Sequence, residues 1–129
     1  LFYCRWPLIW FDRELKGFFD FDIYTKNYDK KIGFSTYQHN NFSVLILKFE
    51  KFKEVAENQI CKYVNDNSFE LINRNLSQDK DYFDLYSEFC SSIVLPKEFV
   101  DYQYSSKYAQ FFYTKEELNK FSYRWKSKN

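Results

Sequence analysis

The segment WFDRELK, residues 10–16, places two carboxylates and two cations directly after a tryptophan. Many carbohydrate-binding sites stack a sugar ring on an indole face and bind its hydroxyls with neighbouring polar groups. WFDRELK is therefore a candidate sugar-binding segment. The alternative is a solvated helix face, on which Asp12 and Lys16 form an i,i+4 ion pair above a buried Trp10.

A second candidate lies near the end of the chain, in YSSKYAQFFY, residues 104–113. Lys107 and two serine hydroxyls come just before an expected helix, where a cation and free backbone N–H groups can contact an anion. A polar turn without a ligand is the alternative interpretation.

Several kinds of site are excluded by residue counts. His39 is the only histidine and is interpreted as a surface turn residue, so a His-rich metal site is excluded. Gly17 and Gly33 are the only glycines and lie far apart, which excludes a phosphate-binding loop within the chain. The three cysteines are also scattered and odd in number, so they predict reduced, buried thiols rather than a disulfide framework.

The composition predicts one folded domain rather than a disordered chain, because 45% of the 129 residues are hydrophobic and 24% are aromatic. The 19 basic and 18 acidic residues are mixed along the sequence, which argues against a nucleic-acid partner. The apolar opening LFYCRWPLIW is too short to span a membrane and lacks the basic region of a signal peptide. We therefore expect a soluble, cytoplasmic chain. The absence of methionine predicts that it is processed, excised or truncated.

Apolar periodicity predicts the helices of the chain. They cover residues 8–19, 49–63 and 82–93, and a last helix follows a capping box formed by Thr114 and Glu117.

Strands are expected in the first half of the chain. FDIYT, residues 21–25, alternates like a short strand, and two further strands, residues 33–38 and 43–48, flank the turn residues HNNF, residues 39–42. These two strands either pair as a hairpin or lie apart. Because residues 44–47 are apolar without polar alternation, we expect them in the interior of a parallel sheet. The predicted architecture is α/β and helix-rich after residue 50.

Residues 44–64, VLILKFEKFKEVAENQICKYV, resemble the part of sulfotransferases in which a buried strand is followed by an acidic residue and a helix. Glu50 takes the acidic position, and Lys51 and Phe52 stand where that pattern has Asp and Leu. The surrounding segments are WFDRELKGFFDFDIY, DKKIGFSTYQ, DKDYFDLYSEF and YSSKYAQFFYTKEELNKFSYRW. In this order they resemble the C-terminal part of the capsular polysaccharide synthesis family, which is itself sulfotransferase-like.

The resemblance implies a sulfotransferase-like, P-loop-type three-layer fold, of which residues 1–129 would be a single partial domain on the acceptor side. It implies a transferase that moves a sulfuryl group from 3′-phosphoadenosine 5′-phosphosulfate (PAPS) to a glycan acceptor. The phosphate-binding residues would lie in a missing N-terminal half, so this chain alone is expected to be inactive and to bind no cofactor or metal. Lys107 is retained as a cofactor-binding candidate. Gln110 stands where the family pattern has Arg.

In such a fold, the segment around residues 10–16 would shape acceptor binding. Asp12 and Arg13 are expected to bind the glycan, since together they supply hydrogen-bond acceptors and donors, while Trp10 and Leu15 anchor the helix. A general-base role for Asp12 or Glu14 would require a carboxylate within about 3 Å of the acceptor hydroxyl, or one water away. The alternative function is a non-catalytic glycan-binding or assembly module. A degenerate remnant without function is a third hypothesis.

Overall fold

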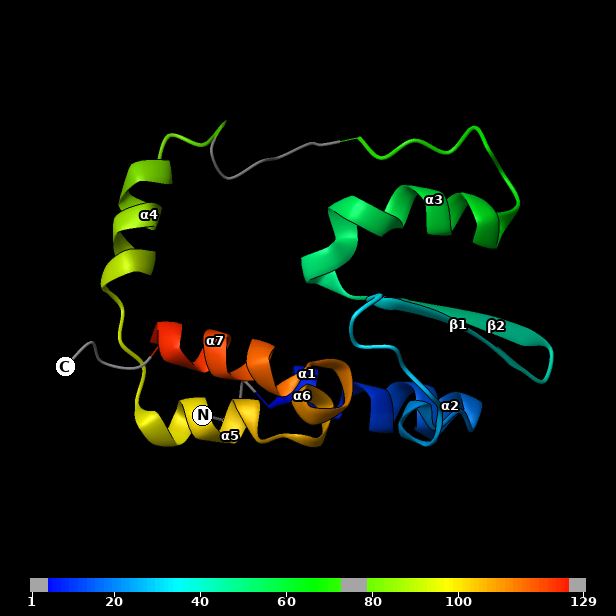
Figure 1. Ribbon diagram of the computed structural model, residues 1–129, viewed down its shortest axis with the longest axis horizontal. Coiled ribbons are helices and arrows are strands. Elements are labelled where there is room, and N and C mark those ends of the chain that lie inside the picture. The colour runs from blue at the N-terminus through cyan, green and yellow to red at the C-terminus, as the bar shows by residue number, and fades with distance from the viewer. Residues whose placement is uncertain (1–4, 73–78, 126–129) are drawn as a thin grey trace.

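The computed structural model describes residues 5–72 and 79–125, which form one β-hairpin and a series of short helices (Figure 1). The hairpin strands are β1 (Phe34–His39) and β2 (Phe42–Leu47). The α-helices are α1 (Trp6–Trp10), α2 (Gly17–Phe19), α3 (Phe52–Val64), α4 (Phe83–Ser92), α5 (Lys97–Tyr104), α6 (Lys107–Phe112) and α7 (Lys115–Trp125). A π-helix, η2 (Phe11–Lys16), and two 3₁₀ turns, η3 (Ile23–Thr25) and η4 (Phe49–Lys51), complete the described elements.

The N-terminal helix is one run through α1, η2 and α2, as the apolar spacing predicts. Pro7 lies in its first turn, where a missing N–H costs no helical hydrogen bond. The run ends at Asp20, which adopts a left-handed conformation with φ 53°. The predicted Asp12–Lys16 ion pair is wrong, because the Lys16 ammonium lies 2.7 Å from the Asp22 carboxylate instead.

Both predicted strands are present, and they pair as the β1–β2 hairpin rather than lying apart. His39 pairs with Phe42 in an antiparallel register, so the connection consists of Asn40 and Asn41. Asn40 has φ 52°, a conformation that asparagine tolerates better than most residues. The strand predicted at residues 21–25 is wrong, since this segment contains η3, which starts where the Asp22 side chain accepts a hydrogen bond from the Tyr24 amide.

The expected parallel sheet is also wrong, and with it the sulfotransferase-like, P-loop-type three-layer α/β fold. The described residues contain only the two-stranded antiparallel sheet, and all their other elements are helices or turns. The apolar run of β2 has another cause, because α3 and the core cover its opposite faces and leave every position half-buried. Val44 and Ile46 face the core, and the Tyr63 hydroxyl of α3 donates a hydrogen bond to the Ser43 carbonyl at 2.6 Å.

The central core is aromatic. Phe21, Ile23 and Phe112 are buried, and they bring together the loop after α2, the hairpin and α6. The half-buried residues around them include Phe11, Leu15, Tyr24, Tyr28, Tyr37, Tyr108, Phe111 and Tyr113. Segments that are distant in the sequence therefore share one cluster of rings.

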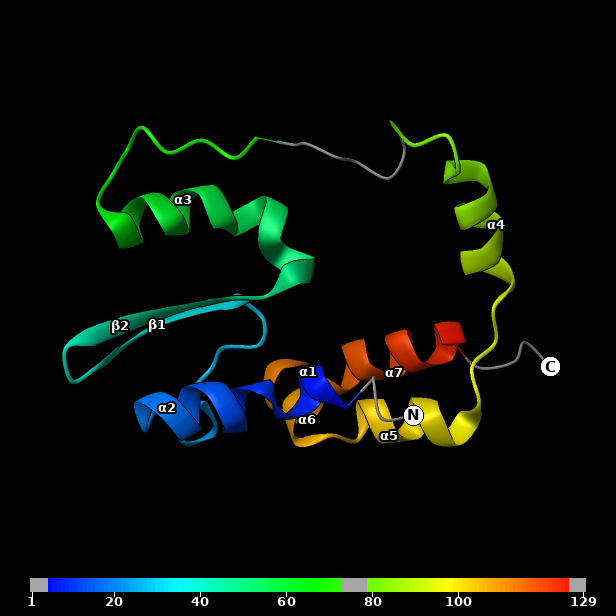
Figure 2. The same cartoon turned by 180° about the vertical axis from the view of Figure 1, so that it is seen from behind.

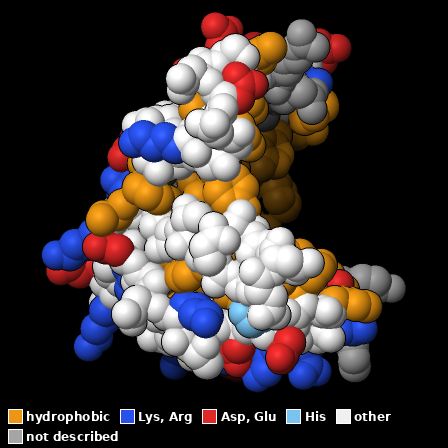
Figure 3. Space-filling model, turned by 90° about the vertical axis from the view of Figure 1, so that its right-hand side faces the viewer, with side chains coloured by type: hydrophobic (Ala, Val, Ile, Leu, Met, Phe, Trp, Pro, Cys, Tyr) orange, Lys and Arg blue, Asp and Glu red, His pale blue; other side chains and the backbone are white. Residues whose placement is uncertain are grey.

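The C-terminal helices α5, α6 and α7 lie side by side in both ribbon views (Figures 1 and 2). The capping box at the start of α7 is confirmed: the Thr114 amide donates to the Glu117 carboxylate at 2.8 Å, and the Glu117 amide donates to the Thr114 hydroxyl at 3.2 Å. Helix α4 stands apart from these helices in both views. Figure 3 shows hydrophobic side chains in the recess between the upper and lower parts of the molecule.

Candidate functional site

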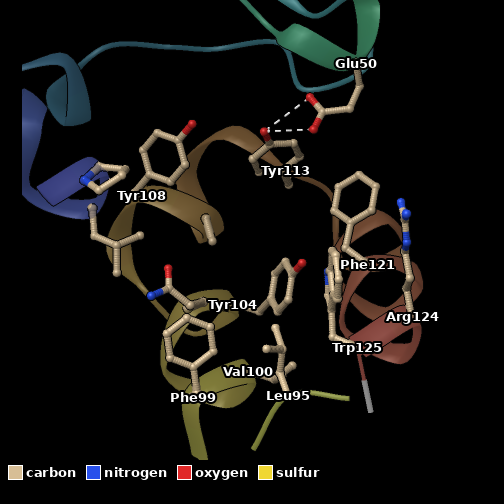
Figure 4. Close-up of a pocket in the computed structure, with 14 residues that line it drawn as sticks. Glu50, Leu95, Phe99, Val100, Tyr104, Tyr108, Tyr113, Phe121, Arg124 and Trp125 are labelled. Carbon is tan, nitrogen blue, oxygen red and sulfur yellow. Dashed lines mark hydrogen bonds between the residues drawn. The ribbon is translucent and has the colours of Figure 1, made fainter. Parts of the chain in front are cut away.

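A pocket with a volume of about 730 Å³ lies where α1, η4 and the C-terminal helices meet (Figure 4). Helices α5 to α7 and the turns beside them supply most of its wall. The lining residues are Pro7, Leu8, Glu50, Leu95, Phe99, Val100, Gln103, Tyr104, Tyr108, Ala109, Tyr113, Phe121, Arg124 and Trp125.

Aromatic rings dominate this pocket. Tyr104, Tyr108, Tyr113, Phe121 and Trp125 are all half-buried, so each ring is partly packed and partly accessible. Phe121 lies edge-on to Tyr113, with their ring centres 5.5 Å apart, and 6.5 Å from the ring of Tyr104. These contacts restrict the rings, and rigid aromatic surfaces lose little entropy when a ligand stacks on them.

One end of the pocket carries the carboxylate of Glu50. The Tyr113 hydroxyl donates to Glu50 and lies 3.2 Å from each of its carboxylate oxygens. Burial raises the pKa of Tyr113 and of Tyr108 above the ordinary value of 10.0, so both hydroxyls are neutral donors at pH 7. Glu50 keeps acceptor capacity beyond this bond, because a carboxylate has about four lone-pair positions.

Helix α7 supplies the charged group on another wall. Arg124 and Trp125 are consecutive, and the Arg124 guanidinium lies 5.0 Å from the centre of the Trp125 ring. Burial raises the pKa of the Tyr104 hydroxyl, while a hydrogen bond from Trp125 and the charge of Arg124 oppose that rise. The charge of Glu50 raises the same pKa, so both the positive and the negative group of the pocket act on the Tyr104 hydroxyl.

A buried ion pair fixes the end of β2 beside this pocket. The side chain of Lys48 is 1% exposed, and its ammonium lies 2.6 Å from the Glu117 carboxylate. It also donates to the Lys30 carbonyl at 3.1 Å and lies 4.7 Å from the ring centre of Tyr113. A small neighbouring cavity of about 110 Å³ is lined by Lys48 and shares Tyr108 and Tyr113 with the main pocket.

The residues predicted as site residues from the sequence lie elsewhere. Asp12 and Lys107 are brought together, with the ammonium 3.1 Å from the carboxylate, and Lys107 also lies 3.8 Å from the ring centre of Tyr24. Arg13 lies over the ring of Trp6 at 4.5 Å. Asp12, Arg13 and Lys107 do not line the main pocket. Their predicted roles in substrate and cofactor binding stay predictions.

Two general features complete the description of the site. Within residues 5–72 and 79–125, no cluster of three or more histidine, cysteine or acidic residues could hold a metal ion. None of the described helices combines the length and the apolar character that crossing a bilayer requires.

Comparison with protein families identifies the family of the chain. The model of the family described as "Putative capsular polysaccharide synthesis protein" matches residues 7–114, which is more than half of the chain. The chain belongs to this family. Neither the curated proteins nor the solved structures gave a match.

The matched range of the capsular polysaccharide synthesis family covers much of the pocket. It includes Glu50, Tyr104, Tyr108 and Tyr113 but ends before the part of the wall that α7 contributes. The aromatic density of residues 104–113 is the sequence signal that marks this region. Arg124 and Trp125 carry no such signal, because a helix face that closes a pocket has the same apolar spacing as one that closes a core.

Proposed function

We propose that the chain provides a carbohydrate-binding pocket in capsular polysaccharide synthesis. The single observation that carries this proposal is the pocket of about 730 Å³, in which half-buried aromatic rings surround a few polar groups. This volume lies within the range of small-molecule sites, about 300–1,000 Å³. The family name supplies the biological context.

The chemistry of the pocket suits a sugar unit. The apolar face of a pyranose ring can stack on Tyr104 or Trp125, and its hydroxyls can donate to Glu50. The Tyr113 hydroxyl holds that carboxylate in place, so little reorganisation accompanies binding. A stacking surface and a hydrogen-bonding carboxylate are sufficient for the function predicted as the alternative, a non-catalytic glycan-binding module.

A titration of the chain with capsular oligosaccharides tests the proposal. We expect saturable binding by calorimetry, and Trp125→Leu should weaken it about tenfold because it removes one stacking surface while keeping an apolar side chain. Tyr123→Leu is the matched control, since Tyr123 lies on the same helix, is 72% exposed and does not line the pocket. Equal losses in both variants, or no binding by a folded chain, would overturn the proposal.

The resemblance also predicts that a complete protein transfers a sulfuryl group from PAPS, and this stays a prediction. The residues described here do not fit that donor, because Lys48 and Lys107 are each paired with a carboxylate and the two glycines form no phosphate-binding loop. We therefore derive no transfer step. Calorimetry with 3′-phosphoadenosine 5′-phosphate tests whether this chain itself holds a donor site, which micromolar binding to residues 1–129 would demonstrate.

A further inference from the structure

Arg124 differs from the other cations near the pocket. Lys48 and Lys107 each lie within about 3 Å of a carboxylate, at 2.6 and 3.1 Å. Among the residues that the structure describes, no carboxylate pairs with the Arg124 guanidinium, which lies 5.0 Å from the ring centre of Trp125. A pocket wall therefore presents a positive charge that no carboxylate of the described residues neutralises.

We infer that the pocket selects an acidic sugar, whose carboxylate binds Arg124 while its ring stacks on the aromatic wall. This inference rests on the proposed carbohydrate-binding function. A guanidinium offers a planar fork of N–H donors that matches a carboxylate in a bidentate arrangement. The stacked position beside Trp125 restricts the fork to few orientations, which lowers the entropy lost on binding.

Glu50, on a different part of the pocket wall, sets the direction of the sugar. Glu50 repels a carboxylate but accepts hydrogen bonds from hydroxyls, so the acidic group and the hydroxyl edge are directed to different walls. Figure 4 shows Glu50 above Tyr113 at one end, and Arg124 on α7 beside Phe121. Tyr104, whose pKa responds to both charges, lies below Tyr113 and beside Trp125 in this view and offers a ring on which the sugar can stack.

A matched set of oligosaccharides tests the inference. The probes are tetrasaccharides of glucuronate, galacturonate or mannuronate, each compared with its methyl ester, which removes the charge and keeps the sugar. Calorimetry should show that at least one acid binds the chain about three- to tenfold more tightly than its ester. This preference should shrink in 0.5 M NaCl, since salt screens a charge at a pocket wall.

Two variants assign the preference to the guanidinium. Arg124→Gln should bring the affinity for the acid to that for the ester, and Arg124→Lys should restore only part of the difference because an ammonium lacks the fork. Lys120→Gln, which removes a charge from the same helix outside the pocket, should leave the preference unchanged.

The outcomes separate the two proposals. Esters that bind as tightly as the acids, or an Arg124→Gln variant that keeps the preference, would overturn the acidic-sugar inference and leave the carbohydrate pocket standing. If none of the probes and no capsular oligosaccharide binds a folded chain, both proposals fail.

Discussion

Replacement of Glu117 by glutamine tests the buried contact that holds the hairpin against the C-terminal helices. Glutamine is almost isosteric and keeps an oxygen for the capping hydrogen bonds from Thr114. It removes the negative charge that faces the Lys48 ammonium at 2.6 Å. The variant therefore isolates the ion pair from the helix cap.

The expected cost follows from the unequal burial of the two partners. The Lys48 side chain is 1% exposed, so loss of its counter-charge leaves a buried ammonium with only the Lys30 carbonyl and a tyrosine ring. Breaking a buried pair from one side typically costs about 3–5 kcal/mol. Because Glu117 is 29% exposed and glutamine still offers a dipole, we expect a loss near the lower limit, about 3 kcal/mol.

Lys48→Met should be much milder. It removes the buried charge and keeps the length and apolar character of the side chain, while the remaining carboxylate is hydrated and bound to Thr114. Because the charge that remains in this variant is on the more exposed partner, we expect a smaller loss than in Glu117→Gln, about 1 kcal/mol. In the double variant, the methionine should recover most of the stability that Glu117→Gln loses.

Urea unfolding followed by circular dichroism measures these differences. With a slope of about 1–3 kcal/mol per molar urea, a loss of about 3 kcal/mol moves the midpoint by about 1–3 M. Equal losses in Lys48→Met and Glu117→Gln, or a Glu117→Gln variant as stable as the parent, would refute the reasoning from burial.

Three further outcomes are expected. Burial raises the pKa of Glu117, but hydrogen bonds from Lys48 and Thr114 outweigh this effect, so the net pKa is lowered. The stabilisation that the Glu117 carboxylate provides is therefore present above the ordinary pKa of 4.5 and is lost as the pH falls below it. Glu117→Gln should flatten the acid unfolding curve in this pH range. Gly33→Ala should destabilise by about 1–2 kcal/mol in urea, because Gly33 has φ 82° and an added Cβ would lie 2.7 Å from a Lys51 side-chain carbon. Asp12→Asn should shift the urea midpoint little, since its ion pair with Lys107 is exposed and worth less than about 1 kcal/mol.

The local elements of the fold could be predicted from the sequence because their signals are local. The capping box at Thr114 and the apolar spacing of residues 49–63 depend on neighbours within a few turns, and the structure contains both helices. The sheet type could not be predicted in this way. An apolar strand such as residues 44–47 is compatible with any two apolar layers, and here the layers are α3 and the aromatic core instead of helices on a parallel sheet.

The pocket was harder to predict than the elements, because it depends on contacts across the chain. Glu50 meets Tyr113 over a separation of 63 residues, and Lys48 meets Glu117 over 69. Charged residues close together in the sequence, such as Asp12 and Arg13, predicted a site on a helix surface outside the pocket instead. Their charges contact Lys107 and the ring of Trp6, which local spacing does not show.

The sequence Lys-Phe-Glu after β2 contains both a residue that stabilises the fold, Lys48, and a residue that lines the pocket, Glu50. Lys48 is the extended residue that precedes η4, and Glu50 is the middle residue of that turn; both side chains reach the segment that carries Tyr113 and Glu117. Phe49, between them, is 84% exposed. The ion pair therefore positions the pocket carboxylate although neither of its members lines the pocket. It follows that Glu117→Gln and Lys48→Met should both weaken glycan binding at temperatures where the variants are still folded. Binding that stays unchanged in Glu117→Gln would show that the Tyr113 hydroxyl alone is enough to position Glu50.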